Sequence, residues 1–292
     1  MTITGTGTEQ DPYIVHSYDE IKTACQGNGV YVELANDIDC NDYGENFVWE
    51  AIQGSGAYYP YYLDLKGHTI KNFKVNDNDY AFKLTGDNSC VKNGKILNCY
   101  LSDTLGFCCR TSSQGRLENL SISTNVSRGL ASGDYRSVFG EYCYIDRCAI
   151  YVEGTVGAGS YNAIFKAPNT DNPIKNTDIL VHIEDSLGLL ADANNSYDKV
   201  FSRCRIRGLY NLASGNPYNY VFTAGLDNCV IDLESNYSGN LSQYVQNCTG
   251  VINTDKLSNY TSTSGMTAVT SQEIINGDAL RAKGFDVINI VA

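Results

Sequence analysis

Carboxylates are the side chains of this sequence that could act in pairs, because cleavage of a glycosidic bond needs two acidic groups roughly 5–9 Å apart. Several acidic residues are neighbours in the sequence or recur at short intervals: Asp134, Glu141, Glu153, Glu184, Asp185, Asp232 and Glu234. None of them belongs to a catalytic motif, and 33 acidic residues in a chain of 292 produce such neighbours by chance. The sequence therefore predicts no catalytic residue and favours a non-enzymatic role, with a polysaccharide depolymerase as an alternative.

Metal and cofactor sites are not predicted either. Residues 76–79 carry oxygen ligands at alternating positions but lack the glycine and the distal glutamate of an EF-hand calcium loop, which favours a solvated turn. His16, His68 and His182 lie far apart in the sequence, and each is interpreted as structural. The sequence contains no zinc-type cysteine spacing and no Walker or HExxH pattern. We therefore expect no metal and no cofactor.

Tyrosine dominates the most unusual local segment, residues 58–62, which read Tyr-Tyr-Pro-Tyr-Tyr. Exposed tyrosines offer a flat, rigid and amphipathic surface for sugars or for another chain. The same residues, buried against a cap, would only pack. Both interpretations remain open, and the candidate binding residues are Tyr58, Tyr59, Tyr61 and Tyr62.

The elements that must position these side chains follow from a repeated six-residue phrase, apolar-x-Asn-x-x-apolar. Its eight copies are centred on Asn72, Asn93, Asn119, Arg147, Asn176, Arg203, Asn228 and Asn247, and successive centres lie 19 to 29 residues apart. Asparagine tolerates the left-handed conformation that a tight bend between two strands requires. A further phrase centred on Asn98 also fits, so the register at this point stays open.

Two other residue types recur with the phrase. Phenylalanine occurs about once per repeat, at positions 82, 107, 139, 165, 201 and 222, which predicts an aromatic ladder. Cysteine follows the bend residue in four copies, as Cys148, Cys204, Cys229 and Cys248. We interpret the 11 scattered cysteines mostly as small buried apolar residues of a protein made in a reducing cytoplasm.

These patterns predict an all-β fold, a right-handed parallel β-helix of about eight coils with short helical caps at both ends. Residues 1–60 are expected to form an N-terminal cap with the leading strands, residues 61–255 the β-helix, and residues 256–292 a C-terminal cap, together one domain. Residues 18–25 predict a short amphipathic helix, followed by a strand over residues 30–34. Thr270 or Ser271 is expected to cap a helix that ends at Gly284, before a closing strand over residues 285–290.

Charge and hydropathy exclude several classes of partner. The net charge of −12 disfavours binding to nucleic-acid phosphates. No stretch approaches 18 apolar residues, so membrane insertion is not expected. Residues 1–20 lack a basic region followed by an apolar run, which predicts that the chain leaves the cell by particle assembly, by lysis or by another route.

Three segments carry a resemblance. Residues 5–15 (GTGTEQDPYIV), residues 65–72 (LKGHTIKN) and residues 282–286 (AKGFD) resemble parts of β-helix surface proteins of gut bacteria and their phages. The resemblance implies a phage virion structural protein of the fibre, tailspike-like or capsid-decoration type, located on the virion surface. It also implies a homotrimer that binds other virion proteins or a host surface glycan. A bacterial surface adhesin is the alternative.

Overall fold

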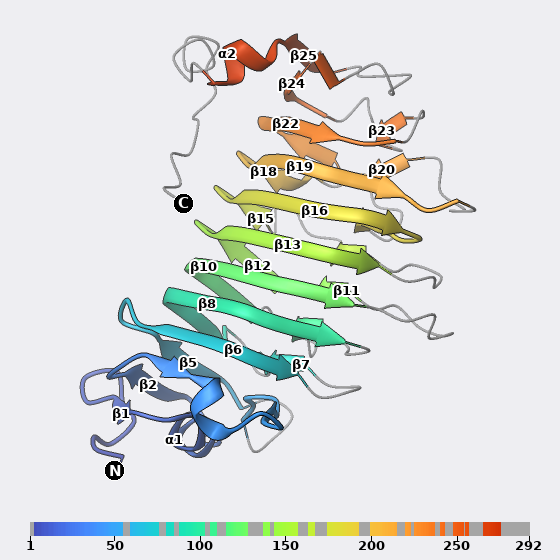
Figure 1. Ribbon diagram of the computed structural model, residues 1–292. Coiled ribbons are helices and arrows are strands. Elements are labelled where there is room, and N and C mark those ends of the chain that lie inside the picture. The colour runs from blue at the N-terminus through green and yellow to red at the C-terminus, as the bar shows by residue number, and fades with distance from the viewer. Residues whose placement is uncertain are drawn as a thin grey trace. The chain divides into compact units, whose positions relative to one another are not determined.

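The computed structural model describes residues 3–54, 59–75, 80–84, 88–102, 106–109, 115–127, 137–140, 143–156, 163–166, 174–192, 199–214, 220–222, 225–236, 240–242, 248–253, 255–256 and 265–275. Within them, short parallel strands form a β-solenoid of about five turns, accompanied by two short α-helices (Figure 1). The predicted fold class, an all-β parallel β-helix, is therefore confirmed. Among the described residues, no helix combines the length and the apolar composition of a membrane-spanning segment.

The chain divides into two compact units. The first comprises Met1–Ser127 and Val138–Cys148, and the second comprises Arg128–Ser137 and Ala149–Ala292. Each unit contains strands that pair in parallel with the strands one turn earlier and one turn later.

The elements up to Cys148 are β1 (Tyr13–Val15), α1 (Tyr18–Ala24), β2 (Val30–Leu34), β3 (Ile38–Asp39), the 3-10 helix η1 (Cys40–Tyr43), β4 (Val48–Trp49), β5 (Tyr61–Asp64), β6 (Thr69–Val75), β7 (Tyr80–Lys83), β8 (Cys90–Ser102), β9 (Gly106–Cys109), β10 (Gly115–Ser127), β11 (Ser137–Phe139) and β12 (Cys143–Asp146).

The elements after Cys148 are β13 (Ala149–Val156), β14 (Ala163–Lys166), β15 (Ile174–Lys175), β16 (Asp178–Ser186), β17 (Leu189–Asp192), β18 (Lys199–Ser202), β19 (Arg205–Leu212), β20 (Tyr220–Phe222), β21 (Gly225–Asp227), β22 (Cys229–Glu234), β23 (Asn240–Ser242), β24 (Gly250–Asn253), β25 (Met266–Val269) and α2 (Ser271–Ile275).

The repeated phrase forms the corners of the solenoid. Its described centres all have a left-handed backbone, with φ between 48° and 61°: Asn72, Asn93, Asn119, Arg147, Asn176, Arg203 and Asn228. The centre at Asn247 lies outside the described residues. The prediction that these residues make the bends is confirmed for every copy that the structure describes.

The open register at Asn93 and Asn98 is resolved because β8 bends twice. The part of β8 before Asn93 pairs with β5, while the part around Asn98 pairs with β6. Asn98 therefore stacks on Asn72, and Asn119 stacks on Asn93, so the phrase marks two different corners of the same unit.

This pair of corners also corrects the predicted number of coils. Asn72 belongs to the second corner, so the copies of the phrase do not correspond one to one with turns. In the first unit Asn93, Asn119 and Arg147 share the other corner, because the residues just before them, Lys92, Glu118 and Asp146, lie opposite one another. The solenoid has about five turns, in place of the eight coils expected.

The predicted aromatic ladder is present inside each unit. In the first, the rings of Phe82 and Phe107 and those of Phe107 and Phe139 lie 5.5 Å apart between centroids. In the second, Phe201 contacts Phe165 at 5.8 Å and Phe222 at 6.1 Å. All six predicted phenylalanines are at most 1 % exposed, so the ladder is part of the core.

The predicted cysteine positions are also internal. The ten cysteines whose side chains are described are free thiols and buried. Cys148, Cys204 and Cys229 each lie within 3.5 Å of a backbone carbonyl oxygen one turn earlier, on Leu117, Ile174 and Phe201 respectively. Their interpretation as small buried residues is confirmed.

Capping residues define both short helices. Ser17 accepts a hydrogen bond from the backbone N–H of Glu20 at the start of α1, whose buried residues are Tyr18, Ile21 and Ala24. Thr270 and Glu273 bond reciprocally at the start of α2, as a capping box does. The predicted strand over residues 30–34 is β2. The predicted continuation to Gly284 and the strand over residues 285–290 lie outside the described residues.

Candidate functional site

The four candidate tyrosines occupy different environments. Tyr59 is 41 % exposed, and Tyr62 is half-buried and points outward from β5. Tyr61 is buried and its hydroxyl donates a hydrogen bond to the carbonyl oxygen of Ile52 at 3.2 Å. Tyr61 therefore packs in the core while Tyr62 faces outward, because neighbouring residues of a strand point to opposite faces. Tyr58 lies outside the described residues.

Tyr62 belongs to a row of residues that lie in register along the first unit. In register, Tyr62 pairs with Tyr31 of β2 and with Cys90 of β8. Cys90 pairs with Arg116 of β10, which in turn pairs with Tyr144 of β12. We name these five residues the tyrosine–arginine strip. Since neighbouring strands lie about 4.8 Å apart, the strip runs for about 19 Å across five strands.

The side chains of the strip interact along it. The rings of Tyr31 and Tyr62 are stacked, with centroids 4.4 Å apart and planes inclined by 21°. The Arg116 guanidinium lies over the ring of Tyr144, 5.4 Å from its centroid, and also forms an ion pair with Glu118. These contacts hold the larger side chains in place before any ligand arrives, which lowers the entropy cost of binding.

Cys90 occupies the centre of the strip and is only 6 % exposed. Burial raises the pKa of its thiol to about 12, and the nearby carboxylate of Glu118 acts in the same direction. A thiol in this state is a poor nucleophile because the thiolate is the reactive form. Cys90 therefore gives the strip a small apolar centre and not a reactive group.

A row of charged residues runs beside the strip, two positions further along each strand. It consists of Glu33, Asp64, Lys92, Glu118 and Asp146. Its carboxylates have cationic partners, among them Lys66 near Glu33 at 3.4 Å and Arg147 near Asp146 at 3.2 Å. The row therefore places positively and negatively charged groups, which can form hydrogen bonds, next to the aromatic rings.

The signal for the strip was present in the sequence. Cys90, Arg116 and Tyr144 each lie three residues before a bend residue, at Asn93, Asn119 and Arg147. Alignment of the phrases on their bends would have collected them in one column. Because the three residues differ in type, a search for one repeated residue type does not find this column.

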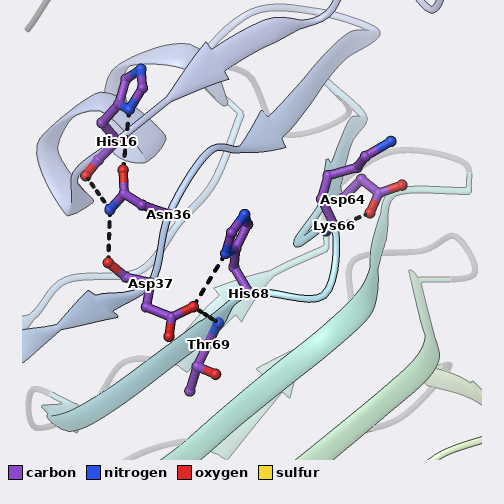
Figure 2. A network of polar contacts seen from close by, with 7 residues as sticks. All are labelled: His16, Asn36, Asp37, Asp64, Lys66, His68 and Thr69. Atoms are coloured by element: carbon purple, nitrogen blue, oxygen red, sulfur yellow. Dashed lines mark hydrogen bonds and ion pairs between the residues drawn. The ribbon is translucent and has the colours of Figure 1, made fainter.

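A polar network near the N-terminus contains two of the three histidines (Figure 2). Asn36 contacts Nδ1 of His16 at 3.1 Å, and its amide nitrogen donates to the carbonyl oxygen of His16. Asp37 accepts a hydrogen bond from the Thr69 backbone N–H at 2.9 Å and lies 3.2 Å from Nδ1 of His68. These two contacts keep the pKa of the Asp37 carboxyl below its usual value.

The hydrogen bonds of this network link neighbouring turns of the chain. Asp37 and Asn36 bond to backbone groups, and no cluster of three or more metal-ligating residues occurs among the described residues. The interactions that the structure shows around His16 and His68 are thus those of hydrogen-bonded loop residues.

The carboxylates that suggested glycoside hydrolysis lie in the second unit where they are described. Glu153 is opposite His182, His182 is opposite Leu209, and Leu209 is opposite Glu234. Glu153 and Glu234 are thus three strands apart, about 14 Å at the usual spacing, beyond the range of a catalytic pair. Asp134 and Glu141 lie outside the described residues.

The remaining carboxylates have partners on the same surface. The Tyr151 hydroxyl donates to Glu153 at 2.7 Å, an interaction that raises the pKa of Tyr151 to about 12. His182 lies 3.2 Å from Glu184. Asp232 accepts a hydrogen bond from the Asn253 amide at 2.6 Å and pairs with Lys256 at 3.2 Å.

Comparison with protein-family models gives no match to the chain, and comparison with curated proteins gives no match either.

Proposed function

We propose that the chain is a non-enzymatic structural protein of a phage virion surface, of the fibre, tailspike-like or capsid-decoration type, and that it binds a host surface glycan. The β-solenoid is compatible with fibre, tailspike and adhesin roles. The observation that carries the binding proposal is the tyrosine–arginine strip, which holds three outward tyrosines and an arginine in one row.

The chemistry of the strip favours a sugar chain. Aromatic rings contact the apolar faces of sugar rings, while the neighbouring carboxylates, lysine and arginine can bond to hydroxyl groups. A polyanion is disfavoured because the charged row contains four carboxylates, Glu33, Asp64, Glu118 and Asp146. An extended, mostly neutral glycan that lies along the row satisfies both features.

A glycan array followed by calorimetric titration of the selected oligosaccharide tests this proposal. We expect Tyr62→Ala and Arg116→Ala each to lower the affinity about tenfold, equivalent to roughly 1.4 kcal/mol. Tyr100→Ala is the matched control, because Tyr100 is 38 % exposed on β8 but lies beyond both corners, outside the strip. Equal losses in all three variants, or no binding to any glycan, would contradict the proposal.

The same samples distinguish the alternatives. If the bound glycan becomes shorter during incubation, the protein is a depolymerase and the non-enzymatic role is wrong. Virion membership is tested by mass spectrometry of purified particles produced by a host that expresses the chain. Recovery of the chain only from the bacterial envelope would instead favour an adhesin.

The homotrimer belongs to the same proposal, since fibre and tailspike rods commonly assemble from several copies. Light scattering at several concentrations measures the mass of the particle directly. A value three times the chain mass of 32.0 kDa is expected. A monomer at all concentrations would remove the trimer from the proposal and leave glycan binding to be judged by the titration.

A further inference from the structure

Two buried thiols of the first unit lie unusually close together. The Sγ atoms of Cys108, on β9, and Cys143, at the start of β12, are 2.9 Å apart. Cys108 is completely buried and Cys143 is 5 % exposed. A disulfide bond needs a sulfur separation of about 2.04 Å, so each pair member must move by less than about 1 Å.

This arrangement differs from that of the stacked cysteines. Cys148 directs its thiol toward the backbone carbonyl oxygens of Leu117 and Asp146. Cys204 and Cys229 have the same type of carbonyl contact within their own unit. For Cys108 the contact is the sulfur of Cys143.

We propose that Cys108 and Cys143 form an oxidation site that closes into a disulfide when the protein meets a small peroxide. The proposal is independent of glycan binding. Hydrogen peroxide is the oxidant proposed because it is small and uncharged, and Cys143, at 5 % exposed, is the more accessible member of the pair.

The reaction balances with one peroxide. The Cys143 thiolate attacks one peroxide oxygen, the O–O bond breaks, and the hydroxide released takes up a proton to become water. The Cys108 thiolate then attacks the sulfenic sulfur of Cys143, the S–S bond forms, the S–O bond breaks, and the hydroxide that leaves takes up a proton to become the second water. The two protons consumed are those that the two thiols lose when they become thiolates. Two thiols are oxidised to one disulfide while one peroxide is reduced to two waters.

The product would tie together segments that are 35 residues apart in the chain. A cross-link between β9 and β12 joins β9, which pairs with β7, to the strand that contributes Tyr144 to the tyrosine–arginine strip. The loop that it closes is long enough for a clear gain in stability. We expect oxidation to raise the Tm by roughly 5–10 °C and a thiol reductant to reverse the shift.

Peptide mapping of peroxide-treated native protein tests the proposal. After alkylation and trypsin digestion, residues 137–147 contain a single cysteine, Cys143, and residues 96–110 contain Cys99, Cys108 and Cys109. We expect one linked species between these two peptides, lighter by two hydrogen atoms than their sum. Fragmentation of that species should place the link on Cys108.

Two variants separate the pair from its neighbour. Cys108→Ser should abolish the linked species and the Tm shift, while the matched control Cys109→Ser should leave both unchanged. The wild-type map is informative even if a variant fails to fold. A link through Cys109, links only between chains, or no link after oxidation would each overturn the proposal.

Discussion

Asn98 donates a hydrogen bond from its side-chain amide to the Oδ1 atom of Asn72 one turn earlier, with an N···O distance of 2.9 Å. Asn72 donates in the same direction to Asp39 at 2.8 Å. The neighbouring corner repeats this order, since Asn119 donates to Asn93 and Asn93 donates to Asp64. Each ladder thus begins at a carboxylate, which only accepts and so fixes the direction of the amides above it.

Replacement of Asn98 tests the contribution of this ladder to stability. Asn98→Ala removes the hydrogen bond and places a β-carbon at a φ of 54°, so we expect a loss of about 2–3 kcal/mol in the free energy of unfolding. Asn98→Gly keeps the conformation accessible and should lose about 1–2 kcal/mol. Urea denaturation followed by circular dichroism measures both values.

Asn88 provides the control for the Asn98 variants. Its φ of 65° is similar, but it lies in a turn outside both ladders. The loss in the free energy of unfolding should therefore be about 1 kcal/mol smaller for Asn88→Gly than for Asn98→Gly. Equal costs at the two positions would show that the ladder bond adds nothing measurable.

The corners could be predicted from the sequence, but their register could not. A bend at positive φ restricts the residue type, and asparagine is the usual solution after glycine, so the phrase reveals each corner. Asn72 and Asn93 carry nearly the same phrase at two different corners, and their local sequences do not distinguish them. Only the pairing of β8 with β5 and β6 does so.

The binding surface was only partly predictable for a related reason. Residues 58–62 lack an alternation of apolar and polar residues, so the sequence does not show that Tyr61 points inward and Tyr62 outward. Arg116 and Tyr144 are far from Tyr62 in the sequence and differ from it in type. They join it because the turns place one strand above another, which depends on loop lengths that the phrase does not encode.

Phe201 fills a gap that another residue leaves in the aromatic ladder of the second unit. The ladder position on β17 is Ala191, which pairs with Phe165 on one side and Phe222 on the other. Phe201 comes from β18 and contacts both phenylalanine rings edge-on. We expect Phe201→Ala to lower the free energy of unfolding by about 3–5 kcal/mol, because it leaves a cavity that the small side chain of Ala191 cannot fill.

A size-swapped double variant sharpens this test. Ala191→Phe alone should destabilise the protein by about 1–3 kcal/mol through overpacking. Combined with Phe201→Ala, it should recover part of the loss, since the new ring occupies the space that the old ring vacates. Strict additivity of the two free-energy changes would refute the packing relationship between positions 191 and 201.

Gly208 marks a position where two strands approach closely. Its φ is +108°, and a β-carbon there would lie 2.1 Å from the carbonyl oxygen of Val181. Gly208→Ala should therefore lower the free energy of unfolding by about 3–5 kcal/mol, from strain and steric overlap together. Gly67→Ala is the control, since Gly67 has a φ of +87° with no atom within 4 Å of the added carbon. It should cost only about 1–2 kcal/mol, and a similar cost for both variants would disprove the overlap.

The buried thiols predict a loss of stability at alkaline pH. Burial raises the pKa of Cys40, Cys90 and Cys148 to about 12, and also raises the pKa of Cys25 and Cys99. The ordinary pKa of a cysteine thiol is about 8.5 in an unfolded chain. Above that pH the unfolded chain releases protons that the folded protein retains, so unfolding becomes more favourable as the pH rises.

Each such thiol removes about 1.4 kcal/mol of stability for every pH unit above 8.5, up to its folded pKa. The stabilisation from the protonated thiols is fully present below pH 8.5. Thiol titration should therefore change the urea midpoint little between pH 7 and 8 and should lower it steeply from pH 9 to 10, when the midpoints are measured with a reductant present. Cys148→Ala should lower the urea midpoint at pH 7. It should also make the decline of stability at alkaline pH less steep, by the contribution of one thiol. A decline of equal steepness in the variant and the wild-type protein would mean that Cys148 already ionises in the folded state, against the effect expected from its burial.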